Sequence, residues 1–244
     1  MRTRSVRALA AGVVALALAL AVVPALHAAD KNKRKQLDLT WTAPDFAARG
    51  IHGIAMLPPS SYDRNHVAEK LAAGLWGQAL GNVNYRWQSP TMVQALMEGP
   101  AADSLLQRAE ASVLQRGRVD SLLAPGLCAT LRTDAVLSLR LDRWEQIEME
   151  YNQAGRPSTT VQVTAALVDA HGHVVWTAAG SETGEGPYHD PNANVLGVTS
   201  SDLTNKPLTG QGGAPAFAEV ATRLFTRWAP LFPAPPADSA AASH

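Results

Sequence analysis

The sequence predicts an α/β domain with α+β character, built on a single mixed sheet that ends in a three-stranded antiparallel meander with helices packed on it. The main observation is the segment 134–181, in which two tight turns join three strand-like runs. In addition, several helical patterns lie between earlier strands and this meander, and a strongly amphipathic helix follows it. Helices gathered between early strands and late antiparallel ones indicate a mixed sheet covered by helices.

Residues 1–28 have the pattern of a secretory signal peptide. Three arginines precede an apolar run over residues 8–23, and small residues follow. We expect cleavage after Ala28, with Ala29 as the alternative. The competing interpretation is an uncleaved membrane anchor, because the run approaches the roughly 20 residues that span a bilayer. No cysteine lies beside the cleavage site, so the lipid attachment typical of bacterial lipoproteins is not available. We therefore expect a periplasmic or secreted protein that meets the membrane only if the N-terminal segment is kept.

Charge argues against nucleic acid as a partner. Cleavage after Ala28 leaves 216 of the 244 residues, enough for one domain with a sizeable core. It removes three of the 21 basic residues and none of the 21 acidic ones, which leaves a net charge of −3. Phosphate binding requires a clustered excess of lysine and arginine, which this balance does not supply.

The rest of the chain divides into three parts. Residues 29–48 form a polar lead-in, in which three alternating apolar residues favour a short edge strand. Residues 49–229 form a single α/β domain that includes a Gly-rich loop at 182–213. Residues 230–244, rich in proline and alanine, are expected to form a disordered tail.

The first confident strand covers residues 53–57, and two prolines end it because proline cannot donate to a sheet ladder. A loop over 60–64 follows. Its serines, Ser60 and Ser61, lie at the carboxyl end of the strand but lack the G-x-S-x-G pattern of a serine hydrolase. A helix comes next, and its spacing predicts one inward face formed by Val67, Leu71, Leu75 and Ala79.

The middle of the chain predicts one strand and three helices. The strand covers 84–88, and a short helix over 91–98 begins with Ser89 as its N-cap. A second helix, for which Asp103 can serve as the cap, ends at Gly117 and carries Leu106, Ala109 and Val113 inward. A third covers about 125–132.

The meander strands alternate with a period of two. In the first strand Ala135, Leu137, Leu139 and Leu141 share one face, and polar residues share the other. The next strand repeats the pattern over residues 160–167. Turn-forming residues at 152–155 and 169–172 predict hairpin connections.

The last helix has the clearest pattern in the chain. Its apolar residues follow helical spacing and predict a buried stripe formed by Phe217, Val220, Ala221, Leu224, Phe225 and Trp228.

Cys128 is the only cysteine, so no intramolecular disulfide can form. Its neighbours are apolar, and a reactive thiol requires an exposed electropositive environment. We expect a buried, inert thiol.

Six residues are candidates for binding. Two arginines on the first meander strand most simply form cross-strand charge pairs, and they are also placed to edge a partner-binding face. The tryptophan beside them is expected in the core or in hairpin packing, although tryptophan is also enriched at interfaces. The other three candidates lie in the Gly-rich loop. The six are Trp144, Arg140, Arg143, Tyr188, His189 and Asp190.

Glu185, His189 and Asp190 offer oxygen and nitrogen ligands to a metal, but such residues are also what solvated turns contain. A specific site needs three or four convergent ligands, and no helical H-x-x-x-H repeat supplies them. We therefore expect no metal site, no cofactor and no catalytic residue.

Three motifs carry a resemblance to a known family. IAMLPP at 54–59, TDAVLSLRLDRW at 133–144 and VTAALVDAHGHVVW at 163–176 resemble the bacterial envelope lipoproteins related to a neisserial surface lipoprotein. More distantly, they are similar to the curli-secretion lipoprotein and to the lipoprotein activators of penicillin-binding proteins. The resemblance implies an α/β domain used for envelope assembly or protein contacts. The chain departs from the family in lacking the lipobox cysteine and in its long Gly-rich segment.

Together these observations predict a non-catalytic periplasmic or exported protein with a protein-interaction or envelope-assembly role. Its partner would be another envelope protein or its own copies, contacted through the edge of the meander and the Gly-rich loop. The alternative is a small-ligand or metal-dependent enzyme with its site on the loop at 182–213.

Overall fold

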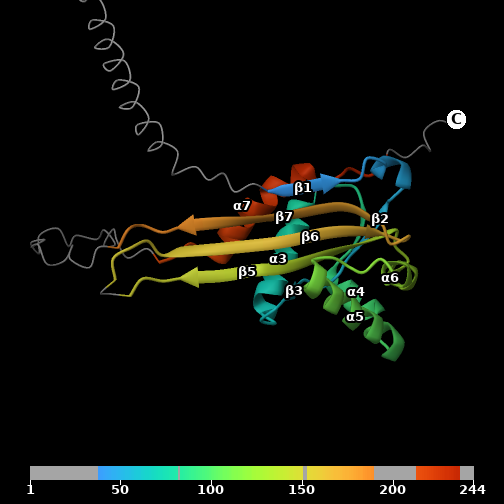
Figure 1. Ribbon diagram of the computed structural model, residues 1–244, viewed down its shortest axis with the longest axis horizontal. Coiled ribbons are helices and arrows are strands. Elements are labelled where there is room, and N and C mark those ends of the chain that lie inside the picture. The colour runs from blue at the N-terminus through green and yellow to red at the C-terminus, as the bar shows by residue number, and fades with distance from the viewer. Residues whose placement is uncertain (1–37, 82, 151–152, 190–212, 237–244) are drawn as a thin grey trace, which may run out of the picture. The chain divides into compact units, whose positions relative to one another are not determined.

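The computed structural model describes residues 38–81, 83–150, 153–189 and 213–236, and its α/β fold confirms the predicted class (Figure 1). These residues form a mixed seven-stranded sheet with the strand order β1-β7-β6-β5-β2-β4, and β3 pairs beside β5. Five α-helices and two short 3-10 helices complete the described part of the chain.

The elements follow the predicted order, with one short strand, β3, and two 3-10 helices added. Their bounds are β1 (Leu39–Thr42), η1 (Phe46–Arg49), β2 (Gly53–Met56), β3 (Ser60–Ser61), α3 (His66–Ala79), β4 (Arg86–Gln88), α4 (Pro90–Leu96), α5 (Pro100–Arg116), α6 (Ala124–Leu131), β5 (Ala135–Ile147), β6 (Ser158–Asp169), β7 (Val174–Glu185), α7 (Phe217–Trp228) and η3 (Ala229–Leu231).

Several predictions fall on residues that the structure does not describe. These are the signal peptide at 1–28, most of the Gly-rich loop and the last eight residues of the tail. The chain divides into two units, Met1–Leu37 and Asp38–His244, and only the second contains described residues. Within them, no helix combines the length and the apolar character that a membrane span requires.

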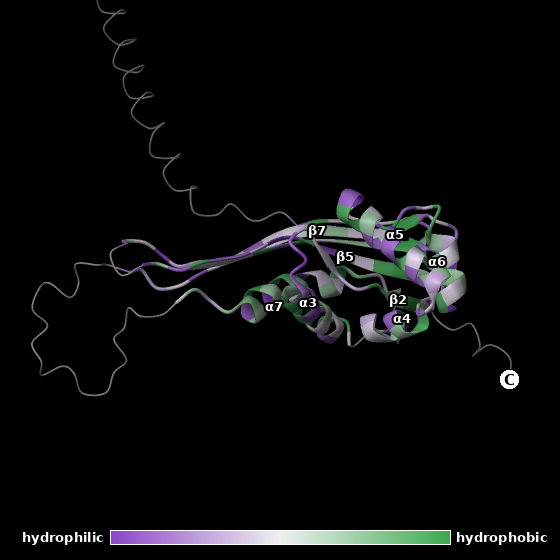
Figure 2. Cartoon of the chain, turned by 90° about the horizontal axis from the view of Figure 1, so that it is seen from below, coloured by the Kyte–Doolittle hydropathy of each residue, from purple (hydrophilic) through white to green (hydrophobic). Residues whose placement is uncertain are grey.

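Helices cover both faces of the sheet, and each face has its own core. Helices α3 and α7 lie on one face, where the odd-numbered residues of β5 point, and α5 and α6 lie on the other (Figure 2). Val136 and Ser138 are buried on this second face. The prediction that β5 is only half-buried is therefore wrong for its first four residues, because α6 packs against them.

The meander is a continuous antiparallel ribbon of three long strands, as predicted. β5 pairs with β6 from Ala135↔Asp169 to Ile147↔Ser158, and β6 pairs with β7 along nearly the same length. A bulge between Leu141 and Arg143 interrupts the first pairing. The extra residue reverses the alternation, so side chains beyond it change faces. The outer part of this ribbon projects past the helices (Figures 1 and 2).

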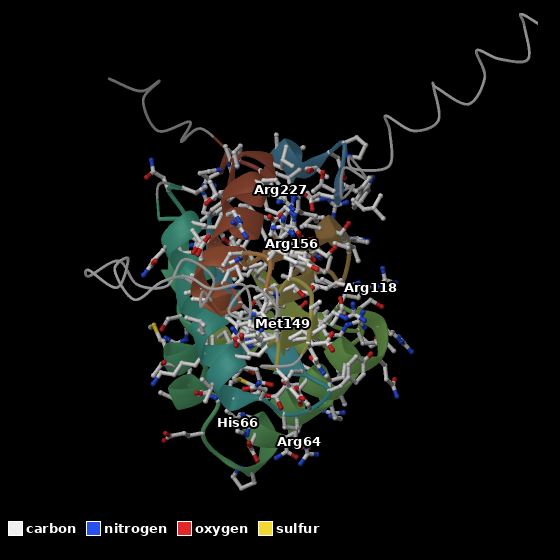
Figure 3. The ribbon with its side chains drawn as sticks, turned by 90° about the vertical axis from the view of Figure 1, so that its left-hand side faces the viewer. Arg64, His66, Arg118, Met149, Arg156 and Arg227 are labelled. Carbon is white, nitrogen blue, oxygen red and sulfur yellow. The ribbon has the colours of Figure 1, made fainter. Side chains whose placement is uncertain are left out.

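β1 confirms the predicted short edge strand. It pairs antiparallel with β7 from Leu39↔Ala179 to Thr42↔Trp176. β1 therefore covers the edge of β7 over residues 176–179. Arg227 on α7 strengthens this corner (Figure 3), because its side chain binds both Asp38, 2.8 Å away, and Glu182 on β7.

The predicted inward face of α3 is only partly correct. Val67 is 81 % exposed, whereas Ala68, Ala72 and Trp76 are buried. Leu75 and Ala79, from the predicted face, are half-buried and pack against the same core. Trp76 decides the orientation, because its ring lies among Trp176, Phe225, Trp228 and Phe232 at centroid distances of 5.2–6.1 Å.

The tail begins later than predicted. Residues after Trp228 continue into η3, and Phe232 is buried in the core, where its ring packs 4.8 Å from that of Trp176. Trp176 Nε1 donates to the Leu231 carbonyl at 3.1 Å, and the Tyr85 hydroxyl donates to the Pro233 carbonyl at 2.9 Å. One aromatic residue thus anchors a segment whose composition alone predicts disorder.

Candidate functional site

The six predicted binding residues do not form one site. Arg140 lies under the end of α5, where it donates to the Leu114 carbonyl at 3.0 Å and lies over the Tyr62 ring. It also pairs with Asp142, whose other carboxylate oxygen accepts from Thr164. Arg140 therefore joins a helix, a loop and two strands.

Trp144 and Arg143 are neighbours on β5 and therefore point to opposite faces, and the bulge before them decides which face each one takes. Trp144 stacks on Phe217 with centroids 5.1 Å apart and planes at 13°, which docks the start of α7 on β5. Arg143 is exposed and pairs with Glu145 at 3.4 Å along the same strand. The expected cross-strand charge pairs are thus replaced, for both arginines, by pairs along β5.

The loop candidates are only partly described. His189 and Gly155 exchange backbone hydrogen bonds of 2.7 and 3.1 Å, which close the outer end of the ribbon, and Tyr188 is 55 % exposed. Asp190 lies outside the described residues. Among those described, no three His, Cys, Asp or Glu side chains gather as a metal site would require. The enzyme alternative concerns mainly residues 190–212 and remains a prediction.

A groove that the sequence did not predict lies between α3 and α4, with a volume of about 930 Å³. It lies at the carboxyl ends of β2 and β4, the position at which open α/β sheets most often bind ligands. Its apolar wall comes from both helices and both strands. The largest contributors are Met56, Trp76, Leu80, Trp87 and Met92.

Two buried polar atoms of groove residues lack a hydrogen-bond partner in the described structure, Trp76 Nε1 and Gln88 Oε1. Gln88 Nε2, by contrast, donates to the Leu131 carbonyl at 2.8 Å. An unsatisfied buried polar group typically costs about 1–3 kcal/mol.

Two glycines of α3, Gly74 and Gly77, also line the groove. A Cβ atom at either position would meet nothing within 4 Å, and neither glycine has a positive φ. Glycine in a helix interior is about 1 kcal/mol less favourable than alanine. No packing or backbone requirement in the described structure explains the two glycines. Because neither has a side chain, the helix backbone itself forms this part of the groove lining. Two glycines inside a helical pattern were the sequence signal for the groove.

Glu69 organises the end of the groove at the start of α3. Its Oε1 accepts from the Ser61 backbone N–H at 2.9 Å and from the Ser61 hydroxyl at 2.7 Å, while Oε2 lies 2.9 Å from His66 Nδ1. The predicted loop at Ser60 and Ser61 is instead β3, which pairs parallel with β5. Ser61 thus connects a strand to a helix.

A second groove, of about 940 Å³, runs between α4 and α5 and has an acidic lining. Glu98, Asp103 and Glu110 contribute carboxylates, and no lysine, arginine or histidine lines it. Partial burial raises the pKa of Glu110, and repulsion from Glu69 and Asp103 adds to the increase. Among the described residues, Glu110 forms neither a hydrogen bond nor an ion pair.

Cys128 confirms the prediction of a buried thiol. Burial in the core under α6 raises its pKa to about 12, with smaller contributions from the charges of Asp169 and Asp134. The thiolate that reactions need is therefore absent at neutral pH.

No protein-family model matches the chain. No curated protein matches its sequence. Among solved structures, the PelC dodecamer of Paraburkholderia phytofirmans is 19% identical, with coverage of 80% of this chain and 96% of that chain and a TM-score of 0.40. The lipoprotein GNA1162 of Neisseria meningitidis is 20% identical, with coverage of 55% and 83% and a TM-score of 0.38. The hypothetical protein CT253 of Chlamydia trachomatis is 15% identical, with coverage of 72% and 96% and a TM-score of 0.37. All three TM-scores are below 0.5, so these likenesses assign neither a family nor a function.

Proposed function

We propose that the protein is a non-catalytic binding domain of the bacterial envelope, periplasmic or secreted, which contacts another envelope protein or its own copies through the outer part of the meander. The location rests on the signal-peptide pattern at 1–28 and on the family resemblance of the three sequence motifs. The binding role rests on the strand edges.

The observation that carries the proposal is a pair of open edges. β5 pairs with β2 and β3 only as far as Leu141, and β7 pairs with β1 only over 176–179. Beyond these points, residues 142–147 and 180–185 pair with β6 alone in the described structure. An unpaired edge presents backbone N–H and C=O groups to which another strand can add.

Charges on these edges favour a specific partner over general aggregation. Arg143 and Glu145 are exposed on the outer part of β5, and Glu182 lies on β7, where Arg223 and Arg227 bind it. Charged side chains on an edge hinder pairing with an arbitrary strand. The partner strand must therefore match this charge pattern.

The proposal is tested with single thiols at the edges. Because Cys128 is buried, Glu145→Cys or Thr183→Cys adds one accessible thiol. The matched control is Leu122→Cys, at an 87 % exposed position outside both edge segments. The full chain would be expressed in a bacterium, oxidised mildly in the envelope fraction and sized by light scattering.

We expect both edge variants to form a disulfide-linked dimer with a second copy, or to crosslink to one envelope protein once the new thiol carries a photo-activatable crosslinker, and we expect the control to do neither. A strict monomer that captures no partner at either edge would overturn the proposal. N-terminal sequencing of the same material shows whether cleavage occurs after Ala28.

A further inference from the structure

Helix α4 forms a ridge between two grooves of opposite character. Thr91 and Gln94 line both the apolar groove towards α3 and the acidic groove towards α5. Met92 and Leu96 on the same helix are 49 % and 44 % exposed. The result is one surface, apolar on one flank and acidic on the other, which does not involve the meander edges.

The apolar flank extends across α3. Val67, Leu71 and Leu75, from the stripe expected in the core, line a shallow depression on this helix, and only Leu75 of the three also packs against the core. His66, Lys70 and Gly74 line both this depression and the apolar groove, and Figure 3 labels His66 at the start of α3. Exposed apolar patches of this kind mark interaction sites. Because Gly74 and Gly77 have no side chains, a bound chain can approach the helix backbone closely.

No lysine, arginine or histidine lines the acidic groove. Glu110 is partly buried near Asp103 and Glu69 and forms no ion pair among the described residues. Its nearest cationic group is His66, which pairs with Glu69 and opposes the rise in the Glu110 pKa. The Asp103 carboxylate is bound by the Gln107 amide, which is neutral. A cation supplied by a partner would relieve the repulsion among these carboxylates.

We propose that a basic amphipathic segment of another protein docks across α4, with its apolar side chains in the groove beside α3 and a lysine or arginine in the groove beside α5. Charge complementarity selects this occupant, because carboxylates line one groove without a counter-charge. The same acidic lining disfavours an anionic membrane surface and nucleic acid. This inference is independent of the proposed edge pairing.

The probe is a fluorescein-labelled peptide in which lysine alternates with leucine and tryptophan. One control peptide carries glutamate in place of each lysine, and another carries serine in place of each apolar residue. Binding to the full chain is measured by fluorescence anisotropy at two salt concentrations. We expect the first peptide to bind, both control peptides to bind at least about tenfold more weakly, and salt to weaken binding.

Gly77→Phe is the blocking variant and Gly77→Ala its control. Both replace a glycine whose Cβ would meet nothing within 4 Å, but only phenylalanine fills the groove. We expect Gly77→Phe to weaken peptide binding by more than about tenfold and Gly77→Ala to leave it unchanged. Glu110→Gln should weaken binding about fivefold and reduce its salt dependence.

Equal binding of all three peptides would overturn the proposal, as would equal affinity of the two Gly77 variants. Self-association that Gly77→Phe abolishes would assign the groove to a second copy instead. The edge variants Glu145→Cys and Thr183→Cys leave the groove intact, so they should bind the peptide as tightly as the unchanged protein. This result does not depend on whether the edges bind a partner, and it therefore separates this inference from the proposed function.

Discussion

Trp144 stacks on Phe217 across the sheet, with ring centroids 5.1 Å apart and planes at 13°. The contact exists because the bulge between Leu141 and Arg143 moves Trp144 to the face that α7 covers. It joins the first turn of a helix to the outer part of a strand that precedes it by about 70 residues. The stack therefore links the outer part of the meander to α7 and the core.

We expect Trp144→Ala and Phe217→Ala each to lower the free energy of unfolding by about 1–3 kcal/mol. Because the rings touch, a double-mutant cycle should give a coupling of about 0.5–1.5 kcal/mol. Urea unfolding measures both. Leu122→Ala combined with Phe217→Ala is the control, since Leu122 is 87 % exposed, and its coupling should be near zero. A coupling for the ring pair no larger than this control would contradict the structure.

Phe232 should matter more than its place in a proline-rich tail suggests. Its ring is buried against Trp176, so Phe232→Ala should lower the free energy of unfolding by about 3–5 kcal/mol. Removing residues 237–244 instead should change it by less than about 0.5 kcal/mol. Thermal unfolding of the two variants makes the comparison. Equal stability of the two would place Phe232 outside the core.

Asp169 should make the fold sensitive to acid. Burial raises its pKa, but the backbone N–H of His173, the Arg49 side chain and the backbone N–H of His171 outweigh it and hold the pKa below its usual range. A carboxylate with a lowered pKa stabilises the fold above its unfolded pKa of about 3.9, and this stability disappears as the pH falls through the folded value. We expect the urea concentration at the unfolding midpoint to decrease once the pH is below about 4. In Asp169→Asn the midpoint should be lower at pH 7 and should change less on acidification. An identical pH profile for the two proteins would rule out this role.

Two glycines should respond to alanine with opposite signs. Gly77→Ala places a methyl group where nothing lies within 4 Å and should raise the free energy of unfolding by about 0.5–1 kcal/mol. Gly117 has φ +72°, and its Cβ would lie 2.9 Å from Thr164 Cγ2, so Gly117→Ala should lower the free energy by about 1–2 kcal/mol. Chemical denaturation of both variants tests the pair. Changes of the same sign would contradict the assigned backbone conformations.

Local pattern predicted those elements in which one signal dominates. The period of two in β5 and β6, the Gly172 turn and the apolar stripe of α7 were all confirmed, because each follows from neighbouring residues along one element. The prediction was only partly correct for α3, where Leu75 and Ala79 pack against the core but Val67 does not. The Trp76 side chain decides the orientation of this helix, because the aromatic cluster that receives it comes from three other parts of the chain.

By itself, the sequence determined the fold class, the order of the main elements and the burial of Cys128, since periodicity, turn residues and composition are local quantities. Only the tertiary structure decided the bulge that turns Trp144 towards Phe217, the anchoring of Phe232, and the paired grooves around α4. These features depend on which surfaces meet across long separations in the chain. The surfaces proposed to bind partners belong to this second group, because a groove or an open edge is defined by what the rest of the fold leaves uncovered.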